Sequence, residues 1–589
     1  MEESWGWSLI FSQLARKKCQ NCIQIDSFRK MKMDEHPVKI VVDCDSQKGE
    51  LKHIWGGIGF DELNLSYMTR GKALFKKLSE FIELPYTVRN HNAFTSGNCL
   101  GSPARGSTNV YNEMPDGSIL YDWSTVDMVY DTYVEAGCKP LIELGFMPRD
   151  LTTGQVDDSN WVYELGTQKY ETHCLWRFPP KDYDRWVDLV YQFVAHLVHR
   201  YGEKEVETWY FELWNEPDIR NYWMGTLEEY CKLYDYSVAA ALRALPTIKI
   251  GGPGSTCPAR EKAGKFLEGF LNHCVRGKNW VNGDVGTRID FISFHTKGAF
   301  FSPSRYYNLH LPIKKESSSS LLMMADIKAG MDIIARFPAL TRLPVFIDEC
   351  DIAVGTPYGV YDNPNYVIHN SEFYPNFVCA LVKRILDLSE NYGNTIDRMT
   401  AWAFYYDGKR YFEGNRTLID NDDIEKPILN AFRLLSRVGH TRLDLQSSGS
   451  RNVFVSPESK IEVDGLAGID ENKITIVLWN QADEWWTEAE DRVIHLQIVN
   501  LPFGEKVSLR HYRIDREHSN AYREWERLGR PQHPTSAQIN QIKERMGLEL
   551  LEPDRELEVS SDRSIHLTIT MPLFGTSLLE ITPMTFSNW

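Results

Sequence analysis

The sequence predicts an α/β fold, a (β/α)8 TIM barrel followed by a β-sandwich, and three observations lead to this prediction. Eight short apolar runs typical of buried strands recur between residues 55 and 405, with helical segments between them. The chain lacks the glycine-rich phosphate-binding motif expected of an open doubly wound sheet. After residue 440 the pattern changes to short strands typical of a sandwich.

The predicted barrel strands are rich in β-branched and aromatic residues. They are residues 55–60, 86–91, 140–146, 209–216, 248–252, 289–295, 344–349 and 399–405. Apolar residues recur at helical spacing in residues 186–201 and 230–245. The chemistry of such a barrel lies at the carboxyl ends of its strands. The polar residues at these ends are Arg89, His91, Asn215, Glu216, His295, Lys297, Asp348, Glu349 and Asp351.

These patterns divide the chain into three parts. Residues 1–34 are an N-terminal extension, residues 35–440 the catalytic barrel, and residues 441–589 the sandwich. Residues 38–42 could add a strand to the sandwich. The other predicted sandwich strands are residues 453–455, 474–479, 493–498, 507–512, 565–570 and 577–581. No low-complexity linker separates the parts, so we expect them to pack tightly.

Composition and charge restrict the class of protein. A formal net charge of -16 disfavours nucleic acid, anionic membranes and polyanionic polymers as partners. Eleven cysteines, an odd number, are typical of reduced thiols in a cytoplasmic protein. Cys19 and Cys22 have no second pair at zinc-finger spacing, so we expect no metal. No apolar run reaches the roughly 20 residues of a membrane span, and the N-terminus lacks the charge order of a signal peptide.

The most distinctive stretch is residues 208–218, in which an apolar run ends abruptly in Asn215, Glu216 and Pro217. Proline cannot continue a central strand, so two polar side chains are expected at its tip. Four aromatic residues precede the glutamate: Trp209, Tyr210, Phe211 and Trp214. A carboxyl group walled by them would be poorly solvated, with the raised pKa that suits a general acid. We therefore predict that Glu216 is catalytic.

A second glutamate, Glu349, ends the seventh predicted strand, whereas Glu216 ends the fourth. These strand ends face each other across the mouth of a barrel, so the two carboxylates can flank a bound bond. In glycoside hydrolysis one carboxyl group protonates the leaving oxygen and the other attacks the anomeric carbon. A separation of about 5 to 5.5 Å would retain the anomeric configuration, and a wider one would invert it. The pair therefore predicts a glycosidase without metal or cofactor.

Several stretches resemble one enzyme family. Residues 209–217 look like its acid/base strand and residues 344–349 like its nucleophile strand, while residues 515–520 and 525–531 are more specific to it. The family is glycoside hydrolase family 39, retaining glycosidases that include β-xylosidases and α-L-iduronidases. The resemblance covers nearly the whole chain beyond residue 38.

The resemblance implies roles for three residues: Glu216 as acid/base, Glu349 as nucleophile, and Asn215 as donor to the sugar 2-hydroxyl. The two activities share a configuration, because removing the C5 carboxylate from an α-L-iduronide leaves the configuration of a β-D-xyloside. One catalytic pair can therefore serve both. We expect a retaining exo-glycosidase acting on terminal xylo-configured sugars.

The choice between the two substrates depends on two cations. Residues 288–298 resemble the iduronidase strand whose lysine, here Lys297, binds the uronate, and Arg416 sits where that branch carries a substrate-binding arginine. Together they could bind one carboxylate through charge-assisted hydrogen bonds. Alternatively, both are solvated loop cations. The first half of the barrel is more similar to the xylosidases, so the iduronide ranks only slightly ahead.

Other predicted site residues have two interpretations each. Arg89 and His91 bind sugar hydroxyls, as the family implies, or support Glu349. His295 belongs to the site or is a core histidine bonded to a backbone carbonyl. Trp402 is a sugar platform by resemblance or a packed barrel residue. The expected partner is a small carbohydrate or oligosaccharide, and a homo-oligomer stays open. A carbohydrate-binding protein without activity and a transglycosylase are the alternative functions.

Overall fold

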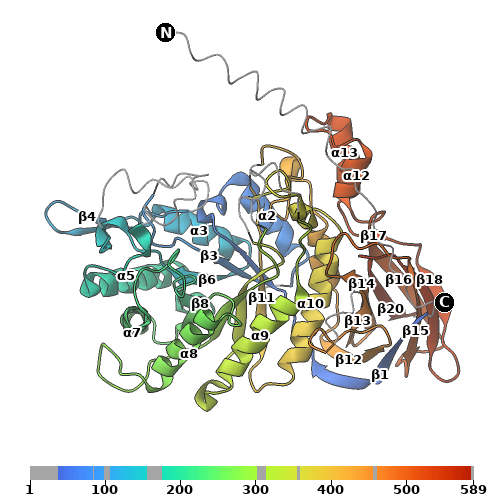
Figure 1. Cartoon of the computed structure of the whole chain (residues 1–589), viewed down its shortest axis with the longest axis horizontal. Coiled ribbons are helices and arrows are strands. Elements are labelled where there is room, and N and C mark those ends of the chain that lie inside the picture. The colour runs from blue at the N-terminus through green and yellow to red at the C-terminus, as the bar shows by residue number, and fades with distance from the viewer. Residues whose placement is uncertain are drawn as a thin grey trace, which may run out of the picture.

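The computed structural model describes residues 37–83, 85–97, 106–154, 175–301, 314–354, 358–406, 408–455 and 461–584. The predicted extension 1–34, with Cys19 and Cys22, lies outside these residues. The larger part of the molecule is a closed barrel of eight parallel strands surrounded by helices, and the smaller part is a separate curled sheet (Figure 1). The predicted fold class is confirmed.

Each of the eight predicted barrel runs overlaps a strand. The strands are β2 (Gly57–Phe60), β3 (Thr87–Asn90), β6 (Lys139–Leu144), β7 (Tyr210–Leu213), β8 (Lys249–Ser255), β9 (Ile292–Lys297), β10 (Val345–Asp351) and β11 (Ile396–Trp402). They pair in chain order, and β11 pairs with β2 to close the barrel. A short hairpin, β4 (Tyr111–Glu113) and β5 (Ile119–Tyr121), follows β3.

Helices lie between the barrel strands. The longer ones are α2 (Thr69–Ser79), α3 (Ser124–Glu135), α5 (Tyr183–Tyr201), α7 (Leu227–Ala244), α8 (Glu261–Arg276), α9 (Ser320–Ile334), α10 (Phe373–Ser389) and α11 (Ile428–Leu435). Local signals set their ends. Asp182 caps α5 by accepting hydrogen bonds from the backbone N–H groups of residues 184 and 185. Thr226 and Glu229 form a capping box at the start of α7.

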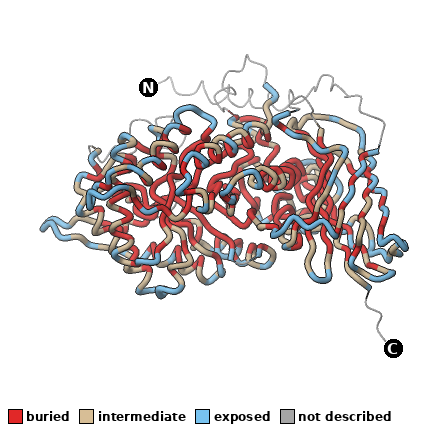
Figure 2. The backbone as a smooth tube through the Cα atoms, turned by 90° about the horizontal axis from the view of Figure 1, so that it is seen from below, coloured by how far each residue is buried: buried red, intermediate tan, exposed pale blue. Residues whose placement is uncertain are grey.

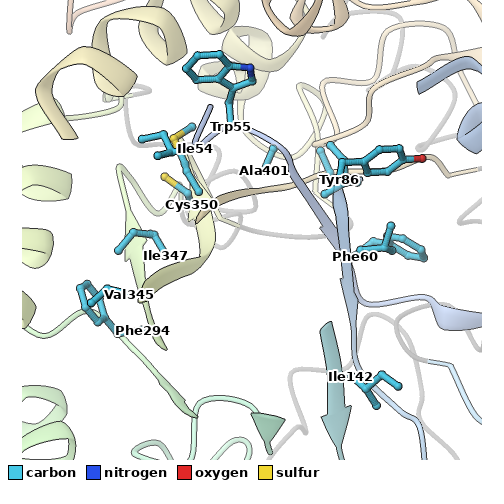
Figure 3. Close-up of a cluster of buried hydrophobic side chains, with 14 of the residues drawn as sticks. Ile54, Trp55, Phe60, Tyr86, Ile142, Phe294, Val345, Ile347, Cys350 and Ala401 are labelled. Carbon is cyan, nitrogen blue, oxygen red and sulfur yellow. The ribbon is translucent and has the colours of Figure 1, made fainter. Parts of the chain in front are cut away.

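Side chains on the two faces of the barrel strands have different surroundings. Outward-facing residues form the main hydrophobic core with the helices, and Figure 3 shows Val345, Ile347 and Cys350 of β10 within it. Inside the barrel, Phe346 packs against Tyr210, with ring centroids 4.9 Å apart, and against Phe291. This aromatic cluster occupies part of the barrel interior.

The smaller part is one continuous sheet of ten strands. These are β1 (Val38–Glu50), β12 (Thr441–Ser447), β13 (Ile461–Asp470), β14 (Lys473–Ala482), β15 (Arg492–Val499), β16 (Lys506–Ile514), β17 (Glu549–Leu550), β18 (Arg555–Glu558), β19 (Ile565–Met571) and β20 (Thr576–Pro583). The sheet curls, so that Ile494 of β15 and Val507 of β16 share one core although their strands lie far apart in the strand order.

The strand predicted at residues 453–455 is wrong, because these residues form a turn in which Phe454 and Val455 are exposed. Val453 is buried and the next two residues are exposed, so burial does not alternate as it does in a strand with one covered face. The sequence analysis also missed β12, β13, β17 and β18. In β13, Asp464, Gly465 and Gly468 interrupt the apolar pattern that would have marked a strand.

The first strand crosses to the C-terminal sheet. Residues of β1 pair antiparallel with β12 and parallel with β15, so the beginning of the described chain lies inside this sheet. Burial alternates along the strand: Ile40 is buried in the sheet core and Val41 is 37% exposed on the other face. The alternation is that of a strand with one covered face.

The barrel and the sheet pack closely. Trp479 and Leu578 of the sheet belong to the same hydrophobic cluster as the barrel helices. Arg384 of α10 donates a hydrogen bond to Glu462 Oε2 at 3.0 Å, and Asn376 of the same helix donates to the carbonyl of Gly575 at 2.8 Å. Figure 2 shows buried residues continuing from one part into the other. The sheet therefore braces one side of the barrel.

Two observations bear on the environment of the chain. The seven cysteines within the described ranges are all buried and unpaired by disulfides. Among the helices of those ranges, none is both long enough and apolar enough to cross a bilayer.

Replacing Ile40 by alanine is expected to lower the free energy of unfolding by about 2 to 5 kcal/mol, because the side chain is fully buried. Urea denaturation followed by tryptophan fluorescence would measure the loss. Val41→Ala on the opposite face of β1 is the matched control, with an expected change within about 0.5 kcal/mol. Equal losses in the two variants would contradict the described faces of this strand.

Candidate active site

A layer of charged side chains lies at the carboxyl ends of the barrel strands. Its members come from all around the barrel and include each residue predicted for the site: Arg89, His91, Asn215, Glu216, His295, Lys297, Glu349, Trp402 and Arg416. Direct contacts link these residues into one network. The structure thus brings together the whole predicted set.

Glu216 lies three residues beyond the end of β7, on a tightly turned segment. Trp214 and Glu216 have positive φ angles of 66° and 44°, which are uncommon for residues other than glycine. The backbone N–H of Glu216 donates to the carbonyl of Gly254 at 2.9 Å, which ties the turn to β8. The carboxylate Oε1 lies 3.0 Å from His295 Nδ1. The side chain is 13% exposed, so a substrate can reach it.

The predicted aromatic wall around Glu216 is wrong. Trp209 packs against Tyr201, Tyr210 belongs to the cluster inside the barrel, and Trp214 packs against Phe146. Phe211 is buried in the main core. Side chains alternate along a strand, so consecutive aromatic residues cannot all face the same carboxyl group. The imidazole of His295 is the hydrogen-bond partner of Glu216 instead.

Glu349 lies within β10, where a bulge redirects the side chains. The pairing of β10 with β9 shifts by one residue between Ile347 and Glu349, which leaves Asp348 as the extra residue. Asp348 and Glu349 both face the barrel interior, where each contacts Arg89. Cys350 returns to the outer core, as Figure 3 shows. The bulge therefore delivers two consecutive carboxylates to the site.

Cations surround the Glu349 carboxylate. Arg89 Nη1 lies 3.1 Å from Oε1, and Lys297 Nζ lies 2.5 Å from Oε2. His91 and His295 approach the carboxylate to 3.5 Å and 3.7 Å. Burial raises the pKa of Glu349, but His295, Lys297, His91 and Arg89 together hold it well below the usual glutamate value. Glu349 is therefore ionised at neutral pH.

His295 lies between the two glutamates. One oxygen of Glu216, one nitrogen of His295 and one oxygen of Glu349 all lie within 4.8 Å of one another. Burial lowers the pKa of His295, but the Glu349 and Asp348 carboxylates raise it to about 10. The ring is therefore protonated at neutral pH. His295 is therefore not a core histidine bonded to a backbone carbonyl, because its ring contacts carboxylates.

Asn215 presents a free amide group. Its Oδ1 accepts a hydrogen bond from Arg89 Nη2 at 3.0 Å. Its Nδ2 is buried and has no hydrogen-bond partner among the residues that the structure describes. A buried donor of this kind usually has a partner. The amide N–H groups are therefore available to a ligand.

Arg89 and His91 are buried beneath the two glutamates. Arg89 Nε donates to Glu212 Oε2 at 2.8 Å, and His91 Nδ1 lies 2.5 Å from Glu143 Oε2. Burial lowers the pKa of His91, but Glu143 and its hydrogen-bonded neighbours raise it well above the usual histidine value. Both side chains are thus cations enclosed by protein groups. Arg89 contacts both Glu349 and Asn215, and His91 contacts Glu349.

Trp402 packs against this cationic layer. Its ring centroid lies 4.9 Å from that of His91 and 5.2 Å from Arg89 Cζ. A Cβ atom at Gly59 would come within 2.3 Å of the ring, so glycine is needed on the neighbouring strand. Trp402 is almost fully buried and supports Arg89 and His91.

Lys297 and Arg416 are not solvated loop cations. Their side chains are only 10% and 9% exposed. Lys297 Nζ contacts Asp351 Oδ2 at 2.6 Å, and Arg416 contacts the same oxygen at 3.5 Å and Asp61 by a short hydrogen bond. The two cations therefore converge on one carboxylate of the protein itself.

The loop that carries Arg416 is held by distant parts of the chain. Lys426 Nζ donates to the carbonyl of Asn415 at 2.8 Å. Phe412 of the loop packs against Trp525 of α12 (Ala521–Arg527), with ring centroids 5.1 Å apart. Ile542 of α13 (Ser536–Glu544) belongs to the same cluster. The stretch that most specifically resembles family 39 thus supports one rim of the site.

Three acidic residues of the network were missed by the sequence analysis: Asp61, Glu143 and Glu212. Glu143 and Glu212 stand opposite each other in the pairing of β6 with β7. An acidic residue inside an apolar strand is costly unless a cation pairs with it. Two such residues at the same level of the barrel could therefore have predicted the buried Arg89.

Two groups within the described ranges place carboxylate and imidazole atoms close enough for a metal ion. The group of Glu216, His295 and Glu349 is surrounded by cations, which oppose a metal. In the other group, His53 and His440 flank Glu83, and their rings stack 4.5 Å apart at 18°. Lone pairs in nearly parallel planes do not converge on one ion. The chemistry of neither group favours a metal.

Comparisons with known proteins identify the family of the chain. The model of glycosyl hydrolases family 39 matches residues 38–558. The chain is 26% identical to a β-xylosidase of Geobacillus stearothermophilus over 488 residues, 80% of this chain and 83% of that one. It is 23% identical to the α-L-iduronidase of Mus musculus over 461 residues, 73% of this chain and 64% of that one.

Solved structures share the fold. A monomeric β-xylosidase from Caulobacter crescentus CB15 matches with a TM-score of 0.72 at 22% identity, covering 93% of this chain and 100% of that one. The family match spans both the barrel and most of the curled sheet. The chain therefore belongs to glycosyl hydrolases family 39 and is a glycoside hydrolase.

Proposed function

We propose that this enzyme is a retaining exo-glycosidase that releases terminal xylo-configured sugars, with Glu216 as acid/base and Glu349 as nucleophile. One observation carries the proposal. Glu349, which is ionised, and Glu216, which is more exposed, both lie beside His295, and one carboxylate oxygen of each lies within 4.8 Å of the other. Retaining glycosidases hold their two carboxyl groups about 5 to 5.5 Å apart. β-D-Xylosides and α-L-iduronides both have the required configuration.

The first step uses the ionised state of Glu349. Its carboxylate attacks the anomeric carbon while Glu216 gives its proton to the glycosidic oxygen, so the aglycone leaves as an alcohol. The result is a covalent glycosyl ester on Glu349. In the second step, Glu216 takes a proton from water, and the resulting hydroxide displaces Glu349 from the sugar. Two inversions give net retention, and both side chains return to their starting states.

Neighbouring groups have supporting roles. The free amide of Asn215 donates to the sugar 2-hydroxyl, a contact expected to strengthen in the transition state. Arg89 is a positioning residue, because it holds both Asn215 Oδ1 and the nucleophile. His295, Lys297 and Arg89 keep Glu349 in its attacking form.

Glu349→Ala is expected to reduce turnover of a nitrophenyl β-D-xyloside by at least about 10³-fold, because no nucleophile remains. Azide should restore turnover by entering the space that the carboxylate leaves. The product should be a glycosyl azide of inverted configuration, identified by NMR. Glu228→Ala, an exposed glutamate in the first turn of α7, is the control and should keep full activity. Wild-type protein that binds xylose without turnover would instead indicate a carbohydrate-binding protein.

Glu216→Ala should distinguish leaving groups. Glycosides with poorly activated alcohols are expected to lose about 10²- to 10⁴-fold in rate, whereas a dinitrophenyl glycoside needs little protonation and should form the covalent intermediate normally. Azide would then attack that intermediate and give a product of retained configuration. Equal losses for both leaving groups would contradict the acid/base role.

The pH dependence of kcat/KM should show the effect of the surrounding cations on the pKa of Glu349. Activity requires the ionised carboxylate, so the acidic limb of kcat/KM is expected below the usual glutamate pKa of about 4.3. Lys297→Met removes a charge 2.5 Å from Glu349, so the pKa of Glu349 should rise. The acidic limb should therefore move to higher pH by about 1 to 3 units.

The control for this profile is Lys328→Met, which removes a half-exposed lysine from α9. Its profile should coincide with that of the wild type. An acidic limb that stays in place, or moves to lower pH, in Lys297→Met would contradict the assignment of Glu349 as the ionised group.

A further inference from the structure

Asp348 is the extra residue of the bulge in β10, directly before Glu349. Ile347 and Cys350 lie in the outer core on either side of this pair, so Asp348 and Glu349 both point into the barrel (Figure 3). The Asp348 side chain is fully buried, whereas Glu349 keeps a small exposed area. Asp348 therefore cannot touch a substrate, and any part that it has in the reaction must pass through a neighbouring side chain.

Two cationic side chains contact the Asp348 carboxylate. Arg89 Nε lies 3.4 Å from Oδ2, and His295 Nε2 lies 3.6 Å from Oδ1. Within the described residues neither oxygen accepts a hydrogen bond of good geometry, so these contacts are ion pairs. Glu212 of β7 also lies nearby and binds the same guanidinium. Burial raises the pKa of Asp348, but Arg89 and His295 hold it below the usual aspartate value, so Asp348 is ionised at neutral pH.

Both nitrogens of the His295 ring face carboxylates. Nδ1 lies 3.0 Å from Glu216 Oε1 and 3.7 Å from Glu349 Oε2, and Nε2 faces Asp348. A neutral imidazole has one N–H group and one lone pair. An ionised carboxylate would repel a lone pair directed at it, and Asp348 and Glu349 are both ionised. The ring therefore carries an N–H group on each nitrogen and a positive charge.

The two glutamates share one negative charge throughout the proposed reaction. Glu349 is the anion in the free enzyme, while Glu216 holds a proton. After the first step Glu349 is an ester, and Glu216 is the anion because it has given its proton to the aglycone. The second step returns the charge to Glu349. One nitrogen of His295 lies within 4.8 Å of an oxygen of each glutamate, so a cation there compensates the charge in both states.

We propose that Asp348 is a positioning residue that fixes His295 as an imidazolium between Glu216 and Glu349, so that one cation compensates whichever glutamate is the anion. Asp348 holds the Nε2 side of the ring and thereby directs the Nδ1–H group at the two glutamates. The inference rests on the proposed function, from which it takes the roles of the two glutamates. It adds Asp348 to the groups on which those roles depend.

The acid/base depends on this cation more than the nucleophile does. Glu349 also contacts Arg89 and Lys297. Within the described ranges, His295 is the only cationic side chain in contact with Glu216. A cation beside a carboxyl group stabilises the anion that proton transfer leaves behind. Loss of the His295 charge should therefore slow the protonation of the leaving group, while Arg89 and Lys297 keep Glu349 ionised.

The test compares kcat/KM at neutral pH for an alkyl and a dinitrophenyl β-D-xyloside, or for the matching iduronides if the wild type cleaves only those. The alkyl alcohol needs a proton from Glu216 in order to leave, and dinitrophenolate does not. His295→Gln is expected to lose at least about tenfold on the alkyl glycoside and less than about threefold on the dinitrophenyl glycoside. Asp348→Asn should lose about three- to tenfold on the alkyl glycoside alone. A purely structural role would slow both substrates equally.

A double variant shows whether Asp348 acts through His295. If it does, Asp348→Asn combined with His295→Gln should cost no more than His295→Gln alone, within about twofold. If Asp348 serves only to neutralise Arg89, the two losses should multiply, which would overturn the inference. Asp554→Asn is the matched control, because it removes a half-exposed carboxylate that lies 2.6 Å from Arg510 of β16, and it should keep full activity.

An NMR titration of labelled histidine measures the charge on His295 directly, and the signal that is absent from His295→Gln identifies the residue. Burial lowers the pKa of His295, but Glu349 and Asp348 raise it to about 10. Asp348→Asn should therefore lower this pKa by about 1 to 3 units. A neutral His295 ring in the wild type at pH 7 would overturn the inference. The wild-type titration decides even if Asp348→Asn proves unfolded by thermal melting.

The outcomes separate the inference from the proposed function. Equal losses on the two leaving groups in folded Asp348→Asn would overturn the inference and leave the glycosidase proposal intact. So would full activity of this variant on the alkyl glycoside. Wild-type protein inactive on xylosides and iduronides alike, with no azide product from Glu349→Ala, would overturn the proposed function and the inference with it.

Discussion

The buried guanidinium of Arg89 is the interaction on which the site depends. A cation removed from water needs carboxylate partners in good geometry, and removing one partner of such a group is strongly destabilising. Arg89 has Glu212 on one side and Glu349 on the other, and it also holds Asn215. Three strands of the barrel, β3, β7 and β10, are thereby fixed relative to one another at the level where the chemistry occurs.

This arrangement makes two glutamates of one site chemically different. Glu349 is enclosed by Arg89, Lys297 and the two histidines, and it stays ionised. Glu216 lies on the more exposed side of His295 and contacts no arginine or lysine in the described hydrogen-bond network. Different environments for two carboxylates are what separates an acid from a nucleophile. The division of roles that we propose therefore follows from where the cations lie.

Much of this could be predicted from the sequence, because periodicity and strand ends are local signals. The eight barrel runs, Glu216 and Glu349 come from apolar stretches that end in polar residues. The bulge at Asp348 could not be predicted, since it depends on how β10 pairs with β9. The prediction of an aromatic wall around Glu216 was wrong because consecutive strand residues face opposite sides. The contact between Asp351 and Arg416 joins the end of β10 to the loop after β11, and no local pattern encodes their approach.

The curled sheet contributes to the site although it supplies none of the residues assigned to catalysis. Arg523 of α12 binds the buried Glu372 through two of its nitrogens, at 2.6 Å and 2.9 Å, and Trp525 packs on Phe412. The contact of Trp525 with Phe412 anchors the segment between β11 and α11, which carries Arg416. From that segment Arg416 contacts Asp351 Oδ2 at 3.5 Å. The position of Arg416 in the site therefore depends on the barrel and the sheet together.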